Sequence, residues 1–106
     1  MLNGALDLSQ FSETAVPKVG VDNDCSERFT VIDVFATDTQ GLLYTLAHTL
    51  FNHGLTVHLA RIATSIDQVV DVFYVLDEHQ RKLEDSKRID RLKSALLEEI
   101  RLLSGA

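Results

Sequence analysis

The stretch at positions 38–43, Asp-Thr-Gln-Gly-Leu-Leu, constrains this chain more than any other. It follows an apolar run, Phe29 to Thr37, that is rich in the β-branched and aromatic residues typical of strands. Beyond it, apolar residues recur at i, i+3, i+4, i+7 and i+8, which predicts a helix that buries this face: Leu43, Leu46, Ala47, Leu50 and Phe51. The chain therefore has to turn from a strand into a helix within this stretch.

A sharp turn from a strand into a helix leaves the first N–H groups of the helix without partners. Together with the positive end of the helix dipole, those groups suit a carboxylate or another anion. Asp38 could hold a ligand's ammonium group there, and Gly41 would allow the backbone to turn or a ligand to come close. The simpler interpretation is that Asp38 caps the helix and Gly41 is a turn glycine, because such turns are common.

Length and composition indicate one small domain. The chain has 106 residues, of which 45% are hydrophobic, so a core is possible but thin. Chains of this size often gain stability by forming oligomers.

The charge balance argues against several kinds of partner. A net charge of -6 disfavours a general nucleic-acid or anionic-membrane surface. RNA binding across an exposed sheet is compatible with the topology below, but it needs basic surroundings that this chain lacks. No apolar run approaches about 20 residues, and no basic start precedes an apolar stretch, so we expect neither a membrane span nor a secretion signal. Cys25 is the single cysteine, which fits a reducing cytoplasm.

The chain divides into elements with few ambiguities. Residues 1–14 are expected to form a flexible arm or a short helix, and Asn23 to Ser26 a turn. Pro17 and Gly20 mark the segment at 15–22 as an edge strand. The further elements are expected as strands at 29–36, 56–66 and 69–76 with a turn at 67–68, and as helices from Leu42 to His53, closed by Gly54, and from Asp85 or Ser86 to about 103. The second helix carries its apolar face on Ile89, Leu92, Leu96, Ile100 and Leu103.

The order β-β-α-β-β-α predicts an α+β sandwich with a four-stranded antiparallel sheet. The strand at 69–76 should fit between those at 29–36 and 56–66, and both helices should cover one face. The other face cannot be fully polar, because both alternating sets of side chains on two of these strands are largely apolar. The sets are Thr30, Ile32, Val34 and Ala36 against Phe29, Val31, Asp33 and Phe35, and Val69, Asp71, Phe73 and Val75 against Val70, Val72, Tyr74 and Leu76. We expect another subunit to bury this face or an edge of the sheet.

No residue pattern indicates catalysis or a metal. His48 and His53 are five residues apart and should not share a helix face, and His58 and His79 complete no zinc spacing. His58 and Arg61 are expected to be structural or interface groups. Asp33 and Asp71 could pair with Arg61 across the sheet. Cys25 has acidic neighbours, which disfavour a thiolate nucleophile.

Four blocks together resemble the ACT domain, and more narrowly the C-terminal ACT domain of bacterial PII uridylyltransferases. They are Phe-Thr-Val-Ile-Asp-Val-Phe-Ala at 29–36, Asp-x-x-Gly-Leu-Leu-Tyr at 38–44, Val-His-Leu-Ala-Arg-Ile-Ala-Thr at 57–64 and Asp-Val-Phe-Tyr-Val at 71–75. The resemblance covers residues 15–103 and implies a ferredoxin-like ACT fold over 15–106. The usual ACT order ends in a strand after the second helix, and here the strand at 15–22 would take that edge position.

The resemblance implies a regulatory, non-catalytic module without a cofactor, linked to nitrogen metabolism through a parent enzyme that adds and removes uridylyl groups. It would bind a small amino acid, glutamine being the family-guided choice, and pair as a homodimer or with another ACT domain. The implied site is Asp38, Thr39, Gln40, Gly41, Leu42 and Leu43.

One feature of the loop departs from the family. Thr39 and Gln40 stand where the family usually has a basic residue and proline, so this loop is less rigid and costs more entropy to order. The alternative is thus an ACT-type dimerisation module that binds no ligand. The sequence leaves open whether the chain is a fragment or a free-standing protein.

Overall fold

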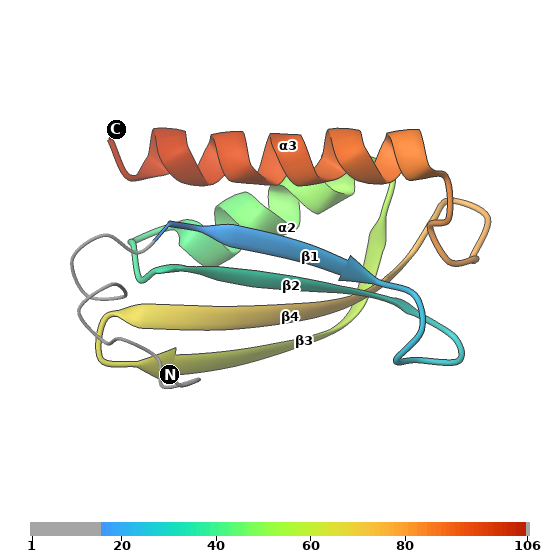
Figure 1. Ribbon diagram of the computed structural model, residues 1–106, viewed down its shortest axis with the longest axis horizontal. Coiled ribbons are helices and arrows are strands. Elements are labelled where there is room, and N and C mark those ends of the chain that lie inside the picture. The colour runs from blue at the N-terminus through green and yellow to red at the C-terminus, as the bar shows by residue number, and fades with distance from the viewer. Residues whose placement is uncertain (1–15, 106) are drawn as a thin grey trace, which may run out of the picture.

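The computed structural model describes residues 16–105, so the arm predicted at 1–14 lies outside the described residues. The chain alternates strands and helices in the order β-β-α-β-β-α (Figure 1). The elements are β1 (Lys18–Asp22), β2 (Thr30–Thr37), α2 (Leu42–Asn52), β3 (Thr56–Ser65), β4 (Gln68–Leu76) and α3 (Ser86–Leu103). This confirms the predicted α+β fold class.

The sheet has the order β1-β2-β4-β3, and every neighbouring pair is antiparallel. β4 lies between β2 and β3, as expected from the strand–helix–strand unit that leaves a gap for it. β1 forms one edge, next to Pro17, which has no N–H to donate to a ladder. β3 forms the opposite edge, and its side chains are exposed along nearly its whole length.

Both helices lie on one side of the sheet, and the core is the layer between them (Figure 1). α3 packs on α2 and β1, whereas α2 also contacts β3. The core is formed chiefly by Ile32, Val34, Leu46, Leu50, Phe73, Val75, Leu92 and Leu96. Asp85 caps α3 by accepting a hydrogen bond from the Lys87 N–H at 3.0 Å, and Gly54 follows α2 with φ 81°, both as predicted.

The hairpin between β3 and β4 differs by one residue from the prediction. Ser65 pairs with Gln68, so the turn consists of Ile66 and Asp67, whereas the sequence suggested 67–68. Ile66 has φ 56°, a conformation that a β-branched residue rarely adopts and that residue preferences therefore do not predict.

The buried face of α2 also differs from the prediction. Leu46 and Leu50 are buried as expected, and Leu42 and Thr49 join them. Leu43 and Phe51 are instead 43% and 73% exposed. Because α3 and the sheet cover only one side of α2, its second apolar stripe remains at the surface.

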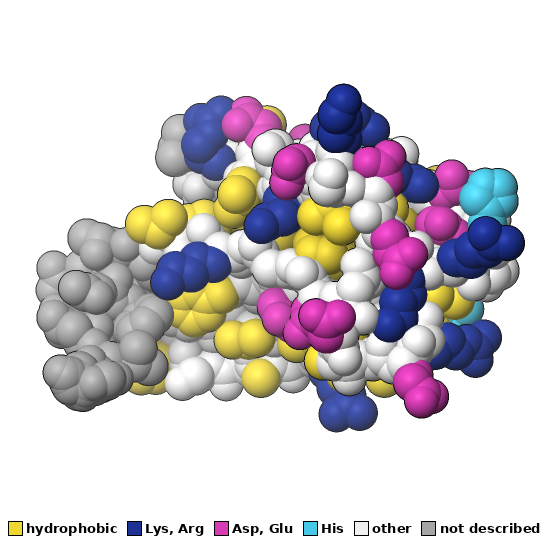
Figure 2. All heavy atoms as spheres, turned by 45° about the vertical axis from the view of Figure 1, so that its right-hand side comes forward, with side chains coloured by type: hydrophobic (Ala, Val, Ile, Leu, Met, Phe, Trp, Pro, Cys, Tyr) yellow, Lys and Arg dark blue, Asp and Glu magenta, His cyan; other side chains and the backbone are white. Residues whose placement is uncertain are grey.

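The sheet face turned away from the helices carries apolar side chains, as the strand alternation predicts. Val31 is buried there, Val72 and Tyr74 are half-buried, and Val70 and Leu59 are 39% and 46% exposed. Figure 2 shows hydrophobic side chains reaching the surface between charged ones. Among the described residues, no helix is long and apolar enough to cross a membrane.

Candidate functional site

The loop between β2 and α2 is held by backbone hydrogen bonds. The Asp38 N–H donates to the Asp67 carbonyl at 2.7 Å, which ties the loop to the turn between β3 and β4. The Leu42 N–H donates to the Thr39 carbonyl at 3.0 Å. Gly41 is the residue before the helix and has φ 84°, a left-handed conformation that glycine adopts without strain.

No side chain caps the start of α2. The interpretation of Asp38 as the cap is therefore wrong, because Gly41 occupies the capping position and offers no side-chain acceptor. The Thr45 N–H reaches the Gly41 carbonyl at 2.9 Å, but the Leu43 and Tyr44 N–H groups have no backbone acceptor within residues 16–105. Two donors at the positive end of the helix dipole are thus available to an anion.

A surface hollow of about 300 Å³ adjoins this helix start. All the loop residues that the resemblance singled out border it: Asp38, Thr39, Gln40, Gly41, Leu42 and Leu43. Sequence reasoning missed the residues that complete the wall, namely Tyr44, Ile62, Thr64, Val69 and Asp71. They come from α2, β3 and β4, so the hollow exists only because the sheet places β3 and β4 beside the loop.

Asp71 is the least ordinary member of this wall. Its side chain is only 2% exposed, and its Oδ1 atom has no hydrogen-bond partner within the described part of the chain. Burial raises the pKa of the Asp71 carboxyl, and the nearby charge of Asp38 raises this pKa further. The strand alternation contained a signal for it, because Asp71 shares its sheet face with Val69 and Phe73, both of which are buried.

The predicted pairing of Asp71 with Arg61 is wrong. Asp71 lies on the face covered by the helices, whereas Arg61 pairs in register with Val72 and lies on the other face. There the Arg61 guanidinium sits 5.9 Å from the centre of the Tyr74 ring. Asp33 shares that face, but β4 separates it from Arg61, and the two form no ion pair.

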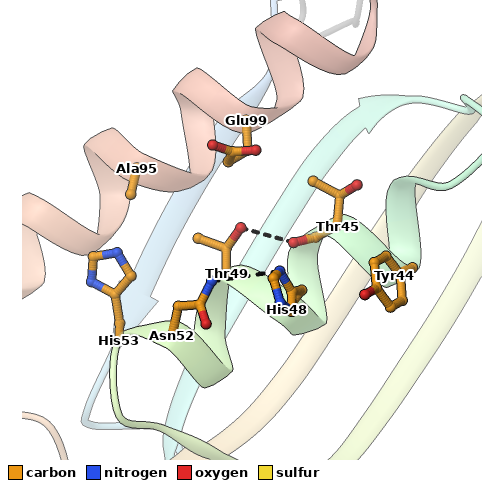
Figure 3. A pocket seen from close by; sticks show the side chains of 8 residues that line it. All are labelled: Tyr44, Thr45, His48, Thr49, Asn52, His53, Ala95 and Glu99. Atoms are coloured by element: carbon orange, nitrogen blue, oxygen red, sulfur yellow. Dashed lines mark hydrogen bonds between the residues drawn. The ribbon is translucent and has the colours of Figure 1, made fainter.

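A second hollow of about 330 Å³ lies between α2 and α3 (Figure 3). Two contacts join polar groups of its wall: the Thr49 hydroxyl donates to the Thr45 carbonyl at 2.8 Å, and Asn52 lies 3.5 Å from a ring nitrogen of His48. Although the spacing suggested separate faces, His48 and His53 both border this hollow, since His53 lies just after the end of α2. No group of His, Cys, Asp or Glu in the described residues could hold a metal ion.

Two further side chains that the sequence singled out, His58 and Cys25, lie at the surface. His58 lies 5.3 Å from Phe29 between ring centres, so its visible contact is aromatic. Cys25 is exposed in the turn after β1. Desolvation and the charge of Asp22 raise the pKa of its thiol, which disfavours a reactive thiolate. The direction agrees with the prediction, but the acidic residue responsible is Asp22 and not the neighbours Asp24 and Glu27 on which the prediction rested.

Comparison with known proteins assigns the chain's relatives. Residues 18–103 match the family described as "ACR9-like, ACT-like domain". Three similar proteins each carry the name bifunctional uridylyltransferase/uridylyl-removing enzyme. That of Zymomonas mobilis is 44% identical over 76% of this chain, that of Phenylobacterium zucineum 41% over 86%, and that of Novosphingobium aromaticivorans 45% over 77%.

The matched region is a small part of these relatives. It covers 9% of the Zymomonas and Novosphingobium enzymes and 10% of the Phenylobacterium enzyme. No solved structure matches the chain.

Proposed function

This chain belongs to the family of ACT-like domains, and we propose that it is a non-catalytic regulatory module that binds a small amino acid in the hollow at the start of α2. One observation carries the proposal. The loop that the sequence singled out borders a hollow that combines open backbone donors with carboxylates. A zwitterionic amino acid offers the complementary pair of charges.

The two ends of the ligand would bind different groups. Its α-carboxylate would accept hydrogen bonds from the Leu43 and Tyr44 N–H groups, where the helix dipole favours a negative charge. Its α-ammonium group would bind the Asp38 carboxylate, which is exposed and caps no helix. Hydrogen bonds to charged groups are the stronger kind, so two such anchors can orient a small ligand.

The ligand would act by shifting how domains pair. The hollow is bordered by Ile62 and Thr64 of β3, the strand whose outer edge pairs with no other strand among residues 16–105. A second ACT domain added at this edge would lie next to the bound ligand, so occupancy could favour one arrangement of the pair over another. Such a population shift would change the activity of an attached or partner enzyme.

The relatives suggest the biological setting. They are named as enzymes that add and remove uridylyl groups, so we propose that this module regulates such an enzyme in the cytoplasm, within nitrogen metabolism. Glutamine is the ligand we favour, on the family resemblance of the loop and its flanking blocks.

The exposed β3 edge also supports a second candidate, an interaction module that pairs with another ACT domain and binds no ligand. Thr39 and Gln40 favour it, since a looser loop is costlier to order. The two candidates differ in one observable: only the sensor changes stability when an amino acid is added.

Gly41→Val tests the placement of the ligand. A β-branched residue at φ 84° costs about 1–3 kcal/mol or displaces the loop, although the space around Gly41 is open, its nearest neighbour being Leu103 at 4.0 Å. We expect a folded protein whose affinity for glutamine, measured by calorimetry, falls at least tenfold. Gly20→Val is the matched control, because Gly20 has no positive φ and no atom within 4 Å of an added Cβ. Unchanged affinity in Gly41→Val would show that the ligand binds elsewhere.

A further inference from the structure

We propose that Asp71 is a second ligand-binding carboxylate in the hollow, which accepts a hydrogen bond from a donor group of the amino acid and rejects ligands that carry a further carboxylate. The inference rests on the proposed function and adds a specificity residue to its site. The ligand class it names is amino acids with an amide side chain, as distinct from their acidic counterparts.

The position of Asp71 supports this role. Asp71 is only 2% exposed and borders the hollow. Its Oδ1 atom has no hydrogen-bond partner in residues 16–105. A buried carboxylate that serves only the fold is normally paired or hydrogen-bonded, since leaving it unpaired costs stability. Because Asp71 borders the hollow, a donor group of a ligand bound there can supply the missing partner.

The surroundings of Asp71 decide which ligands fit. Asp38 lies close enough for its charge to act on Asp71, and both border the same hollow. Two neighbouring carboxylates attract an ammonium or amide N–H and repel another carboxylate. The donors at the start of α2 accommodate one carboxylate of the ligand, and a second carboxylate near Asp71 would meet the negative charges of Asp71 and Asp38. Glutamine and glutamate have nearly the same shape, but the side chain of glutamine ends in a neutral amide and that of glutamate in a carboxylate.

Calorimetric titration of the 106-residue chain with L-glutamine and L-glutamate tests the proposal. We expect the wild-type protein to bind glutamine at least tenfold more tightly than glutamate. Asp71→Asn keeps the size and one acceptor oxygen but removes the charge, so the ratio of the two affinities should fall at least tenfold. Asp71→Leu removes the acceptor as well and should lose glutamine binding while remaining folded.

Asp33→Asn is the matched control. Asp33 is an exposed strand residue on the opposite face of the sheet, so its loss should leave both affinities unchanged. Wild-type binding of glutamine with an unaltered glutamine-to-glutamate ratio in Asp71→Asn would overturn the role of Asp71 and leave the proposed function standing. If the wild-type chain binds neither amino acid, both proposals fail. The unfolding temperatures of the Asp71 variants are measured without ligand. A variant that binds glutamine weakly because it is misfolded would also unfold at a lower temperature.

Discussion

Single residues decide what the start of α2 can bind. Gly41 ends the loop without offering a cap, and the Leu43 and Tyr44 N–H groups therefore lack backbone acceptors among the described residues. The sequence predicted the loop and the turn glycine, because glycine allows the backbone to turn sharply between a strand and a helix. It did not identify Asp71 as a site residue: the strand alternation groups this residue with Val69 and Phe73, but only the folded sheet brings it close to Asp38.

Asp71 makes a testable contribution to stability. Its pKa in the folded protein is raised above 3.8, so the cost of its charge is absent below that value and appears as the pH rises through the folded pKa. Asp71→Asn should therefore stabilise the free protein at pH 7, by roughly 1–3 kcal/mol if the whole desolvation cost is recovered. The gain should shrink towards zero at pH 4. Urea unfolding at the two pH values measures it.

Asp33→Asn again provides the comparison, since Asp33 is exposed. Its unfolding free energy should follow that of the wild type at both pH values. A loss of stability in Asp71→Asn at pH 7 would mean that the carboxylate stabilises the fold through a partner, contrary to the unpartnered Oδ1 atom found among residues 16–105.

At the scale of elements, α2 shows how far periodicity reaches. Each residue turns a helix by about 100°, and the apolar positions of α2 cover roughly half of its circumference. The sequence identified this wide stripe but not the part that the sheet covers, so Leu46 and Leu50 were predicted correctly while Leu43 and Phe51 were not. Similarly, the hairpin was predicted but its turn shifted by one residue, because pairing of Ser65 with Gln68 fixes the register.

β3 is the element that we expect to mediate pairing. It is a long edge strand with exposed side chains, and such edges readily add another strand. Leu59→Lys places a charge on this edge and should weaken self-association at least tenfold, as measured by analytical ultracentrifugation. Leu102→Lys on α3 is the matched control, since Leu102 is 55% exposed and Leu59 is 46% exposed.

Comparing Leu59→Lys with Leu102→Lys shows whether the chain self-associates through β3 or through α3. Equal weakening by both substitutions would point to charge rather than the β3 edge. A wild-type chain that stays monomeric at all concentrations would contradict pairing through β3.

For the whole molecule, strand and helix patterns were sufficient to predict the architecture, including β4 between β2 and β3. They also predicted the loop of the candidate site. They could not predict the full hollow, because Ile62, Thr64 and Val69 reach it only through tertiary packing. Nor could they say which apolar surface a partner covers, since buried and partner-covered faces have the same composition.

The most direct test of the sensor account is thermal unfolding of the chain with each of the 20 amino acids at millimolar concentration. A ligand at about 100 times its Kd stabilises the folded state by about 2.7 kcal/mol. For a domain of this size, that raises the unfolding temperature by several degrees or more. The account predicts such a shift for one amino acid, glutamine before all others. No shift with any amino acid would contradict it and favour the module that pairs without a ligand.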